Sequence, residues 1–229
     1  NGRVLDPERR SMLGEAEWRW LDEQARGDLD HLFVASSVPW ILPRAIHDLE
    51  AWNTSLAGGA WGARVRRSAE RLRQEIDLEH WAAFGTSFQN LADLLAGVSA
   101  GERGEPPATI TALSGDVHFG YVAEVDLGGR SRVRQVVSSP FRQSTEAFER
   151  HAQRLATTFP PVSLACRALV ATTPHARPGF DWRVTDGPWF DDHLVVLTVD
   201  GRRAHIAYEV ADLDDQHRPV LRRIAEREL

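Results

Sequence analysis

The spacing of hydrophobic and polar residues predicts a chain that contains both helices and strands. Apolar residues recur at helical spacing over residues 11–26, 63–98, 143–157 and 162–171. Short apolar or alternating runs predict strands over residues 31–35, 109–113, 121–127, 133–137, 180–184, 193–199 and 204–210. Helices dominate the middle of the chain and hairpins its end, so we expect a mixed α/β or α+β fold of layered helices and sheets.

Two segments show neither the helical spacing of apolar residues nor the alternation typical of strands. Residues 36–62 combine prolines and tryptophans with the pair Gly58-Gly59, a composition typical of a long ordered loop. The stretch after residue 210 is rich in aspartate, and we expect a polar tail there. Between two predicted strands, Asp200-Gly201 is a strong signal for a β-hairpin.

Composition and charge exclude several classes of protein. A hydrophobic fraction of 42% and a charged fraction of 26% are typical of a globular protein and argue against disorder. The net charge of -6 gives no support to a nucleic-acid surface, which is normally basic. The single cysteine, Cys166, excludes an internal disulfide and a cysteine-rich zinc site. No apolar run approaches the roughly 18 residues that a membrane helix needs.

One short segment carries the clearest candidate chemistry. Leu113 closes a predicted buried strand, Gly115 allows a tight turn, and Asp116 and His118 follow directly. In open α/β sheets, ligands bind beyond the carboxyl ends of the strands. A carboxylate and an imidazole are both ligands that metal ions accept. We therefore predict that Asp116 and His118 are metal ligands, although Gly-Asp turns without such a role are common.

Several segments occur in the same order as in the PhoD-like (alkaline phosphatase D) metallophosphoesterases, and together they resemble the C-terminal half of that family's domain. Residues 114–118, Ser-Gly-Asp-Val-His, are similar to the family's last metal-binding motif. The other matching segments are Ser11 to Leu21, Ser36 to Trp40, His47 to Asn53, Asp77 to Phe84 and Ser138 to Arg142. The resemblance extends over residues 3–142 and is looser beyond them.

The resemblance implies a four-layer αββα sandwich of the calcineurin-like metallophosphoesterase type, of which residues 1–229 would be the C-terminal part. It implies a hydrolase in which metal ions hold a phosphate ester and activate a hydroxide for attack. Asp116 and His118 would be two of the ligands, with Fe, Ca, Mn and Zn as candidate metals.

The family's earlier ligands have no counterpart in this sequence. These are an aspartate after the first strand, a Gly-Asp motif and an asparagine, all in the N-terminal half of the domain. The sequence starts with Asn1 rather than methionine, so we expect a truncation or a processing point there, and both a cytoplasmic and an exported location are open. The missing N-terminal half is the expected partner, and this fragment alone is expected to hold an incomplete site.

Four further residues are candidate pocket contributors: His47, Asp77, His80 and Arg142. His47 lies in the aromatic segment, where a histidine that only caps or hydrogen-bonds is also common. Asp77 and His80 have the spacing of one helix face and suit a pocket wall, although Asp77 also suits a helix cap. Arg142 follows Ser-Ser-Pro and suits either a phosphate or a surface carboxylate.

Two other functions are open. Ser114 beside Gly115, with the Asp77-x-x-His80 pair, would suit a serine esterase, although the Gly-x-Ser-x-Gly elbow is absent. A non-catalytic half-domain that binds a partner is favoured by the missing ligands. Labelling of Ser114 by a fluorophosphonate would favour the esterase over the metal-dependent enzyme.

Overall fold

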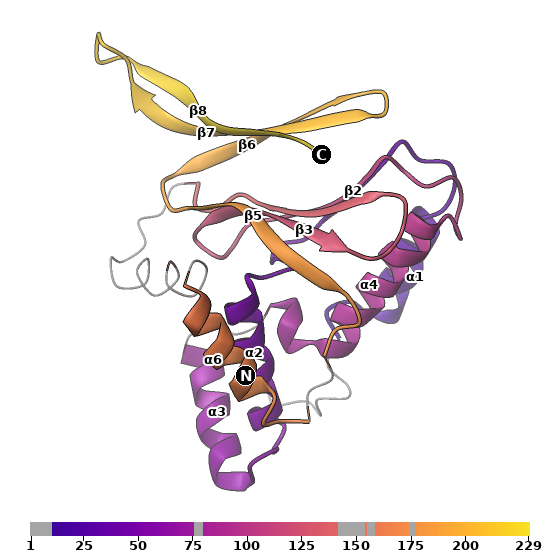
Figure 1. Cartoon of the computed structure of the whole chain (residues 1–229), viewed down its shortest axis with the longest axis vertical. Coiled ribbons are helices and arrows are strands. Elements are labelled where there is room, and N and C mark those ends of the chain that lie inside the picture. The colour runs from indigo at the N-terminus through magenta and orange to yellow at the C-terminus, as the bar shows by residue number, and fades with distance from the viewer. Residues whose placement is uncertain (1–10, 76–79, 142–153, 155–158, 175–176) are drawn as a thin grey trace.

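The structure is a computed structural model that describes residues 11–75, 80–141, 154, 159–174 and 177–229 (Figure 1). Within these ranges it contains two β-sheets and a set of helices. The predicted mixture of helices and strands is therefore confirmed. The predicted helix over residues 143–157 lies outside the described residues, apart from Arg154.

The larger sheet has five strands in the order β1-β2-β4-β3-β5. Strands β1, β2 and β4 run parallel to one another, whereas β3 and β5 run antiparallel to their neighbours. The bounds are His31–Ala35 for β1, Thr109–Ser114 for β2, Gly120–Asp126 for β3, Arg132–Val137 for β4 and Asp181–Trp189 for β5. The three parallel strands thus present their carboxyl ends at one edge, where the predicted ligands follow β2.

The smaller sheet is an antiparallel meander of β6 (His193–Asp200), β7 (Arg203–Leu213) and β8 (Pro219–Glu228). It covers one face of the larger sheet, as Figure 1 shows. Valines from β3 and β4 meet apolar side chains of β7 and the end of the chain in a shared core, whose buried members are Val122, Val136, Ala204, Ile206, Tyr208 and Leu229. Burial of this apolar surface joins the two sheets.

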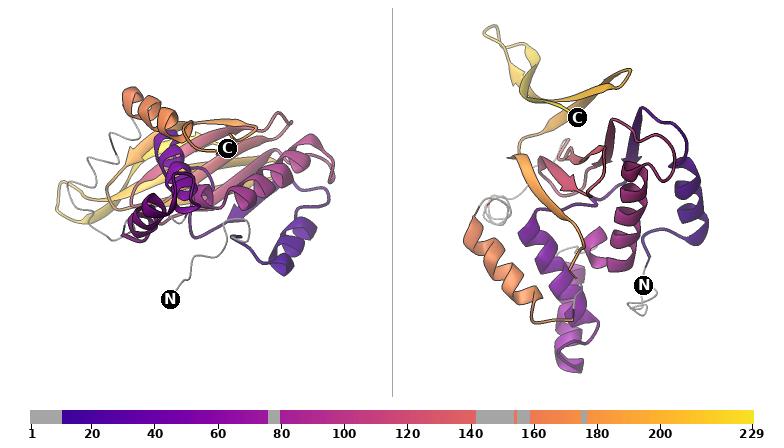
Figure 2. Two further views of the ribbon diagram at one scale, coloured as in Figure 1. Left: turned by 90° about the horizontal axis from the view of Figure 1, so that it is seen from below. Right: turned by 45° about the vertical axis from the view of Figure 1, so that its right-hand side comes forward.

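Helices cover the other face of the five-stranded sheet. Helices α1 (Glu15–Gln24) and α4 (Gly85–Ala100) pack their apolar sides on β2, β3 and β4 in the main core. Helix α2 (Arg44–Ala57) packs against both α3 (Ala63–Glu75) and α6 (Pro160–Val170), as the views of Figure 2 show. A short 3-10 helix, η2 (Trp81–Ala83), joins this group to α4.

Three sequence predictions of local structure were wrong. Residues 36–62 are not one long loop, because Pro43 precedes helix α2 and Gly58 follows it. The polar tail instead contains β8, which is paired along its length with β7. The predicted helical stretch 63–98 is divided, because η2 and the non-helical Phe84 separate α3 from α4.

A buried glutamine ties the chain together just beneath the carboxyl edge. Gln135 on β4 is fully buried, and its Oε1 accepts the backbone N–H groups of Trp40 and Ile41 at 3.1 and 3.2 Å. Its Nε2 donates to the Ala112 carbonyl at 3.2 Å and to Ser114 Oγ at 3.0 Å. Gln135 therefore fixes the segment after β1 against the end of β2, which holds the candidate site in place.

The four-layer sandwich stays a prediction. The described residues show helices on one face of the paired sheets, and no helix among them lies on the outer face of β6–β8 (Figure 1). Among these helices, none is both long enough and apolar enough to span a lipid bilayer.

Candidate functional site

The candidate site lies where the three parallel strands end. Backbone hydrogen bonds join the segments that leave these strands: Ser36 N to Leu113 O at 3.0 Å, Gly115 N to Ser37 O at 3.3 Å and Ser138 N to Ser114 O at 2.9 Å. The turn after β2 is held from the β4 side as well, because the His118 N–H donates to Ser139 Oγ at 3.1 Å. Three neighbouring strand ends thus form one platform around Asp116 and His118.

The turn after β2 is conformationally strained. Asp116 and His118 adopt left-handed backbone conformations, with φ of 75° and 61°. Such conformations cost a non-glycine residue roughly 1–2 kcal/mol each and are concentrated at functional sites. A Cβ atom at Gly115 would lie 3.3 Å from the Ser138 carbonyl oxygen, so a larger residue there would push the turn away from β4. Such conformations persist where the surrounding structure fixes them, and here the hydrogen bonds from Gly115 N to Ser37 O and from His118 N to Ser139 Oγ do so.

Asp116 faces His80 across this edge. The distance from His80 Nε2 to Asp116 Oδ2 is 3.4 Å, and the Asp116 side chain is 54% exposed. His80 immediately precedes η2, which begins at Trp81. The Trp81 indole N–H donates to Ser36 Oγ at 3.3 Å, so the helix that positions His80 is anchored to the end of β1.

On its inner side His80 meets a buried carboxylate. Glu50 of α2 is fully buried, and its Oε2 lies 3.4 Å from His80 Nδ1. The second oxygen, Oε1, accepts the His80 backbone N–H at 2.7 Å. Glu50, His80 and Asp116 therefore form a line from the protein interior to the surface, which we call the Glu50–His80–Asp116 array.

The charges of this array support one another. Burial of the ring lowers the pKa of His80, but the neighbouring carboxylates of Glu50 and Asp116 outweigh burial, and the net shift is upward. A fully buried carboxylate is costly unless it is paired and hydrogen-bonded. His80 supplies a backbone hydrogen bond to Glu50 Oε1 and an ion-pair contact at 3.4 Å to Oε2, and these two contacts offset part of the cost of burying this glutamate.

The other predicted site residues do not join this array. His47 is buried, with its ring 4.9 Å from that of Phe88 and 4.8 Å from that of Trp182. It lines a cleft of about 550 Å³ that α2, α6 and β5 form, which we call the α2–β5 cleft. Asp77 and Arg142 lie outside the described residues.

The esterase hypothesis gains nothing from the position of Ser114. Its hydroxyl accepts a hydrogen bond from Gln135 Nε2 at 3.0 Å. In the part of the chain that the structure describes, no hydrogen bond joins Ser114 to His80, whose ring faces two carboxylates instead. A serine nucleophile needs a base within hydrogen-bonding reach.

The donor types at the edge suit a metal ion, but they make up only part of a site. Asp116 is an exposed carboxylate and His118 an imidazole, and these are common ligands of zinc and iron. Among the described residues, no group of three or more His, Cys, Asp or Glu side chains is placed to hold a metal ion. Catalytic metal sites normally use at least three protein ligands. Asp116 and His118 would therefore need ligands from outside this set.

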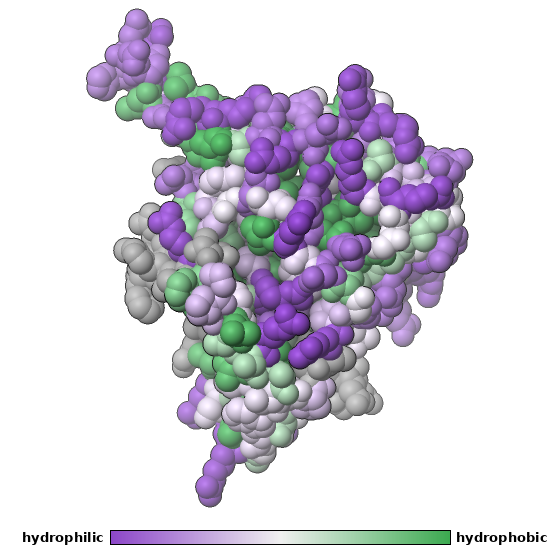
Figure 3. Space-filling view, in the orientation of Figure 1, coloured by the Kyte–Doolittle hydropathy of each residue, from purple (hydrophilic) through white to green (hydrophobic). Residues whose placement is uncertain are grey.

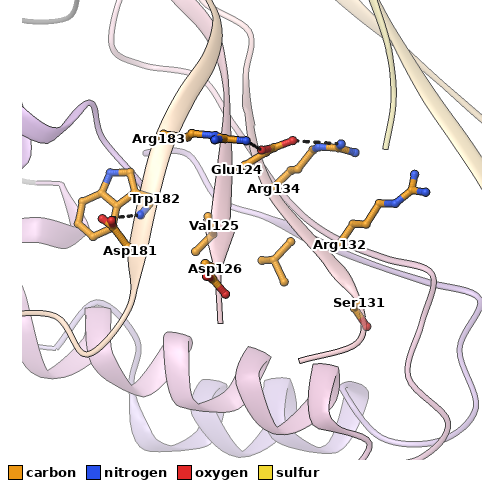
Figure 4. Close-up of a pocket in the computed structure, with 10 residues that line it drawn as sticks. Glu124, Val125, Asp126, Ser131, Arg132, Arg134, Asp181, Trp182 and Arg183 are labelled. Carbon is orange, nitrogen blue, oxygen red and sulfur yellow. Dashed lines mark hydrogen bonds and ion pairs between the residues drawn. The ribbon is translucent and has the colours of Figure 1, made fainter. Parts of the chain in front are cut away.

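A second cleft, of about 600 Å³, lies over β3, β4 and β5, and three of its charged groups, Glu124, Arg134 and Arg183, are paired with one another (Figure 4). Glu124 lies between two arginines, 2.8 Å from Arg183 and 3.5 Å from Arg134. Hydrophilic side chains cross this face of the molecule in Figure 3. Glu124 therefore joins β4 and β5 to β3 through a cross-strand ion-pair network.

Comparison with known proteins shows one distant likeness. No family model and no curated protein matches the chain. A solved structure of PhoD aligns with 96% of this chain at 10% sequence identity and a TM-score of 0.46. The chain covers 33% of the length of that structure. A likeness at this level is too low to establish a shared fold or activity.

Sequence reasoning missed Glu50 as a site residue. In the sequence it is one of several acidic positions near His47, within a segment whose composition predicts a loop. When the segment is known to be helix α2, Glu50 can be recognised as a charged residue between the buried positions His47 and Ala51. An acidic residue on the inward side of a helix is a signal that it has a specific partner.

Proposed function

We propose that this chain is part of a metal-dependent phosphoric ester hydrolase of the metallophosphoesterase type. The observation that carries this proposal is the exposed Asp116 carboxylate, held beyond the end of β2 by His80 and the buried Glu50. Its support is the resemblance of residues 114–118 to a metal-binding motif, together with the strained turn that presents Asp116 and His118.

Each residue has a distinct task in this proposal. Asp116 and His118 provide an oxygen and a nitrogen ligand. A bound metal ion would supply Lewis acidity toward a phosphoryl group and toward water. His80 holds Asp116 in place through its Nε2, and Glu50 holds the His80 ring through Nδ1. Partners of this kind around ligating groups commonly set metal affinity by a factor of about 10–100.

The remaining ligands are proposed to come from the N-terminal half of the same domain, as the resemblance implies. In that arrangement residues 1–229 form the C-terminal part of a four-layer sandwich. Iron, calcium, manganese and zinc are the candidate metals that the resemblance implies; a carboxylate suits all four, whereas an imidazole favours iron or zinc over calcium. The substrate is a phosphate monoester or diester.

The test is a metal titration of the full-length protein, followed by hydrolysis of bis(p-nitrophenyl) phosphate. We expect Mn²⁺ binding by calorimetry and activity that chelation abolishes. D116N and H118A should each weaken Mn²⁺ binding by at least about tenfold, since each removes one ligand. Asp126→Asn and His217→Ala are the matched controls, because Asp126 ends β3 and His217 also has a positive φ, of 57°. Both controls should bind Mn²⁺ as the wild type does.

Two results would exclude this function. Activity that survives chelation together with the double substitution of Asp116 and His118 would show that no metal at this edge is required. Absence of both metal binding and hydrolysis in the full-length protein would instead favour a non-catalytic half-domain that binds a partner.

A further inference from the structure

The α2–β5 cleft has the size and lining of a small-molecule site. It measures about 550 Å³ and is bordered by α2, α6 and the beginning of β5, with Arg44, Asp48, Arg167, Arg177, Phe180 and Trp182 among its lining residues. Ligand pockets in proteins typically measure about 300–1,000 Å³ and combine apolar walls with a few charged groups.

Four arginines and two aspartates line this cleft, so its lining is positive although the chain carries a net charge of -6. Two of the arginines have partners. Arg44 pairs with Asp181, and its guanidinium lies over the Trp182 ring at 3.5 Å from the centroid. Arg183 turns to Glu124 on β3, as Figure 4 shows.

Among the described residues, the other two arginines have no such partner. Arg167 on α6 and Arg177 before β5 are both exposed, and within the described residues neither has a carboxylate oxygen within 4.0 Å. Their charges nevertheless reach Asp48: burial raises the pKa of its carboxyl, and the arginines act against that rise. Arg167 also repels Arg44. Two guanidinium groups without a carboxylate partner among the described residues therefore line one cleft, an arrangement that an anion would stabilise.

We propose that the α2–β5 cleft binds a small phosphate monoester. Its phosphoryl group lies between Arg167 and Arg177, which approach from two different segments. A tetrahedral phosphate dianion can accept hydrogen bonds from two guanidinium groups at the same time, each on a different pair of oxygens. A planar carboxylate has only two oxygens, and one guanidinium group already pairs with both. The organic group lies along the apolar wall of Val170, Phe180 and Trp182.

This site is separate from the edge that carries Asp116. Asp48 and Glu50 are two residues apart on α2, so their side chains point to nearly opposite sides of the helix. Glu50 faces His80, whereas Asp48 lines the cleft. Neither Asp116 nor His80 lines the cleft, and the proposed binding needs no metal ion.

The experiment is a calorimetric titration of the full chain with phenyl phosphate in the presence of excess EDTA, so that a metal centre cannot contribute. Inorganic phosphate and phenol are titrated in parallel. We expect phenyl phosphate to bind more tightly than inorganic phosphate, and phenol not to bind. R167Q/R177Q should weaken binding by about 100-fold, roughly tenfold for each guanidinium group that no longer donates to the phosphate.

Two further variants exclude trivial explanations. R64Q/R66Q removes the same charge from exposed positions on α3, which does not line the cleft, and should bind as the wild type does. Asp48→Asn removes a negative charge beneath the arginines and should tighten binding, which a folding defect would not do.

The proposal is overturned if phenyl phosphate does not bind the wild type at millimolar concentration. It is equally overturned if R64Q/R66Q weakens binding as much as R167Q/R177Q does, or if D48N binds more weakly than the wild type. Binding under EDTA together with a failed metal titration would leave this site standing and reject the hydrolase, so the two outcomes are distinguishable.

Discussion

Replacing His80 with leucine tests the ion pair that supports Asp116. Glu50 is fully buried, and its Oε2 lies 3.4 Å from His80 Nδ1. The H80L variant retains the backbone N–H that donates to Glu50 Oε1 at 2.7 Å, but it removes the ring that faces Oε2. Glu50 is then left as an interior carboxylate with one of its two oxygens unpaired.

The expected loss of stability is about 3 kcal/mol. Removing one partner of a buried ion pair typically costs about 3–5 kcal/mol. The retained hydrogen bond to a charged oxygen offsets part of this cost, so the lower end of that range applies. With a urea m-value of about 2–3 kcal/mol/M, the unfolding midpoint should fall by roughly 1 M.

Urea unfolding followed by tryptophan fluorescence measures this shift, and two further variants interpret it. His205→Leu is the control, since His205 is exposed on β7, and its stability should change by less than about 0.5 kcal/mol. E50Q/H80L should recover at least half of the loss, because a neutral amide costs less to bury than a charge. The reasoning is refuted if H80L is as stable as H205L, or if E50Q/H80L is no more stable than H80L.

Three other predictions concern the structure around the site. Gln135→Leu leaves two buried backbone N–H groups without an acceptor and should lower the free energy of unfolding by about 2–4 kcal/mol in the same urea assay. Gly120→Ala would place a Cβ 2.2 Å from His193 Nε2, so it should cost about 1–3 kcal/mol and lower the midpoint of thermal unfolding. Burial lowers the pKa of His193 below its usual 6.5, so the unfolded chain takes up the proton first. The difference in free energy of unfolding between the wild type and the His193→Gln variant should therefore be largest at about pH 7.5. It should shrink toward about pH 5.5 in urea titrations.

The strands were the most predictable part of the fold. Strands β1, β2, β3 and β4 lie within about one residue of their predicted positions, because apolar runs bounded by turn residues are local signals. The end of β2 was thereby placed correctly, and with it the position of Asp116. The sequence did not predict the strand order, because the pairing of β2 with β4 around β3 depends on contacts far apart in the chain.

Helix α2 and strand β8 show where local signals fail. Helix α2 buries four polar residues, His47, Asp48, Glu50 and Asn53, and these disguise its amphipathic period. Strand β8 is largely exposed and rich in charge, so alternation is weak, and only its pairing with β7 defines it. Both elements are defined by partners rather than by their own pattern.

The same reasoning applies to the candidate site. The Asp77-x-x-His80 spacing drew attention to His80 as one face of a helix, yet its described contacts are with Glu50, 30 positions earlier, and with Asp116 beyond β2. No local spacing encodes contacts of that range. Whether Asp116 and His118 ligate a common metal stays a prediction for the same reason, since the additional ligands must come from elsewhere in the fold.

Helix α2 links the two proposed sites, and this explains its unusual composition. One side of the helix places Glu50 beneath His80, and the nearly opposite side places Asp48 beneath the arginines of the α2–β5 cleft. A helix that served packing alone would be more stable with apolar residues at both positions, because each buried carboxylate carries a desolvation cost. The chain retains both carboxylates at this cost. The substitution of either by leucine should therefore affect ligand binding at its own side of α2 more than it affects the folding of the domain.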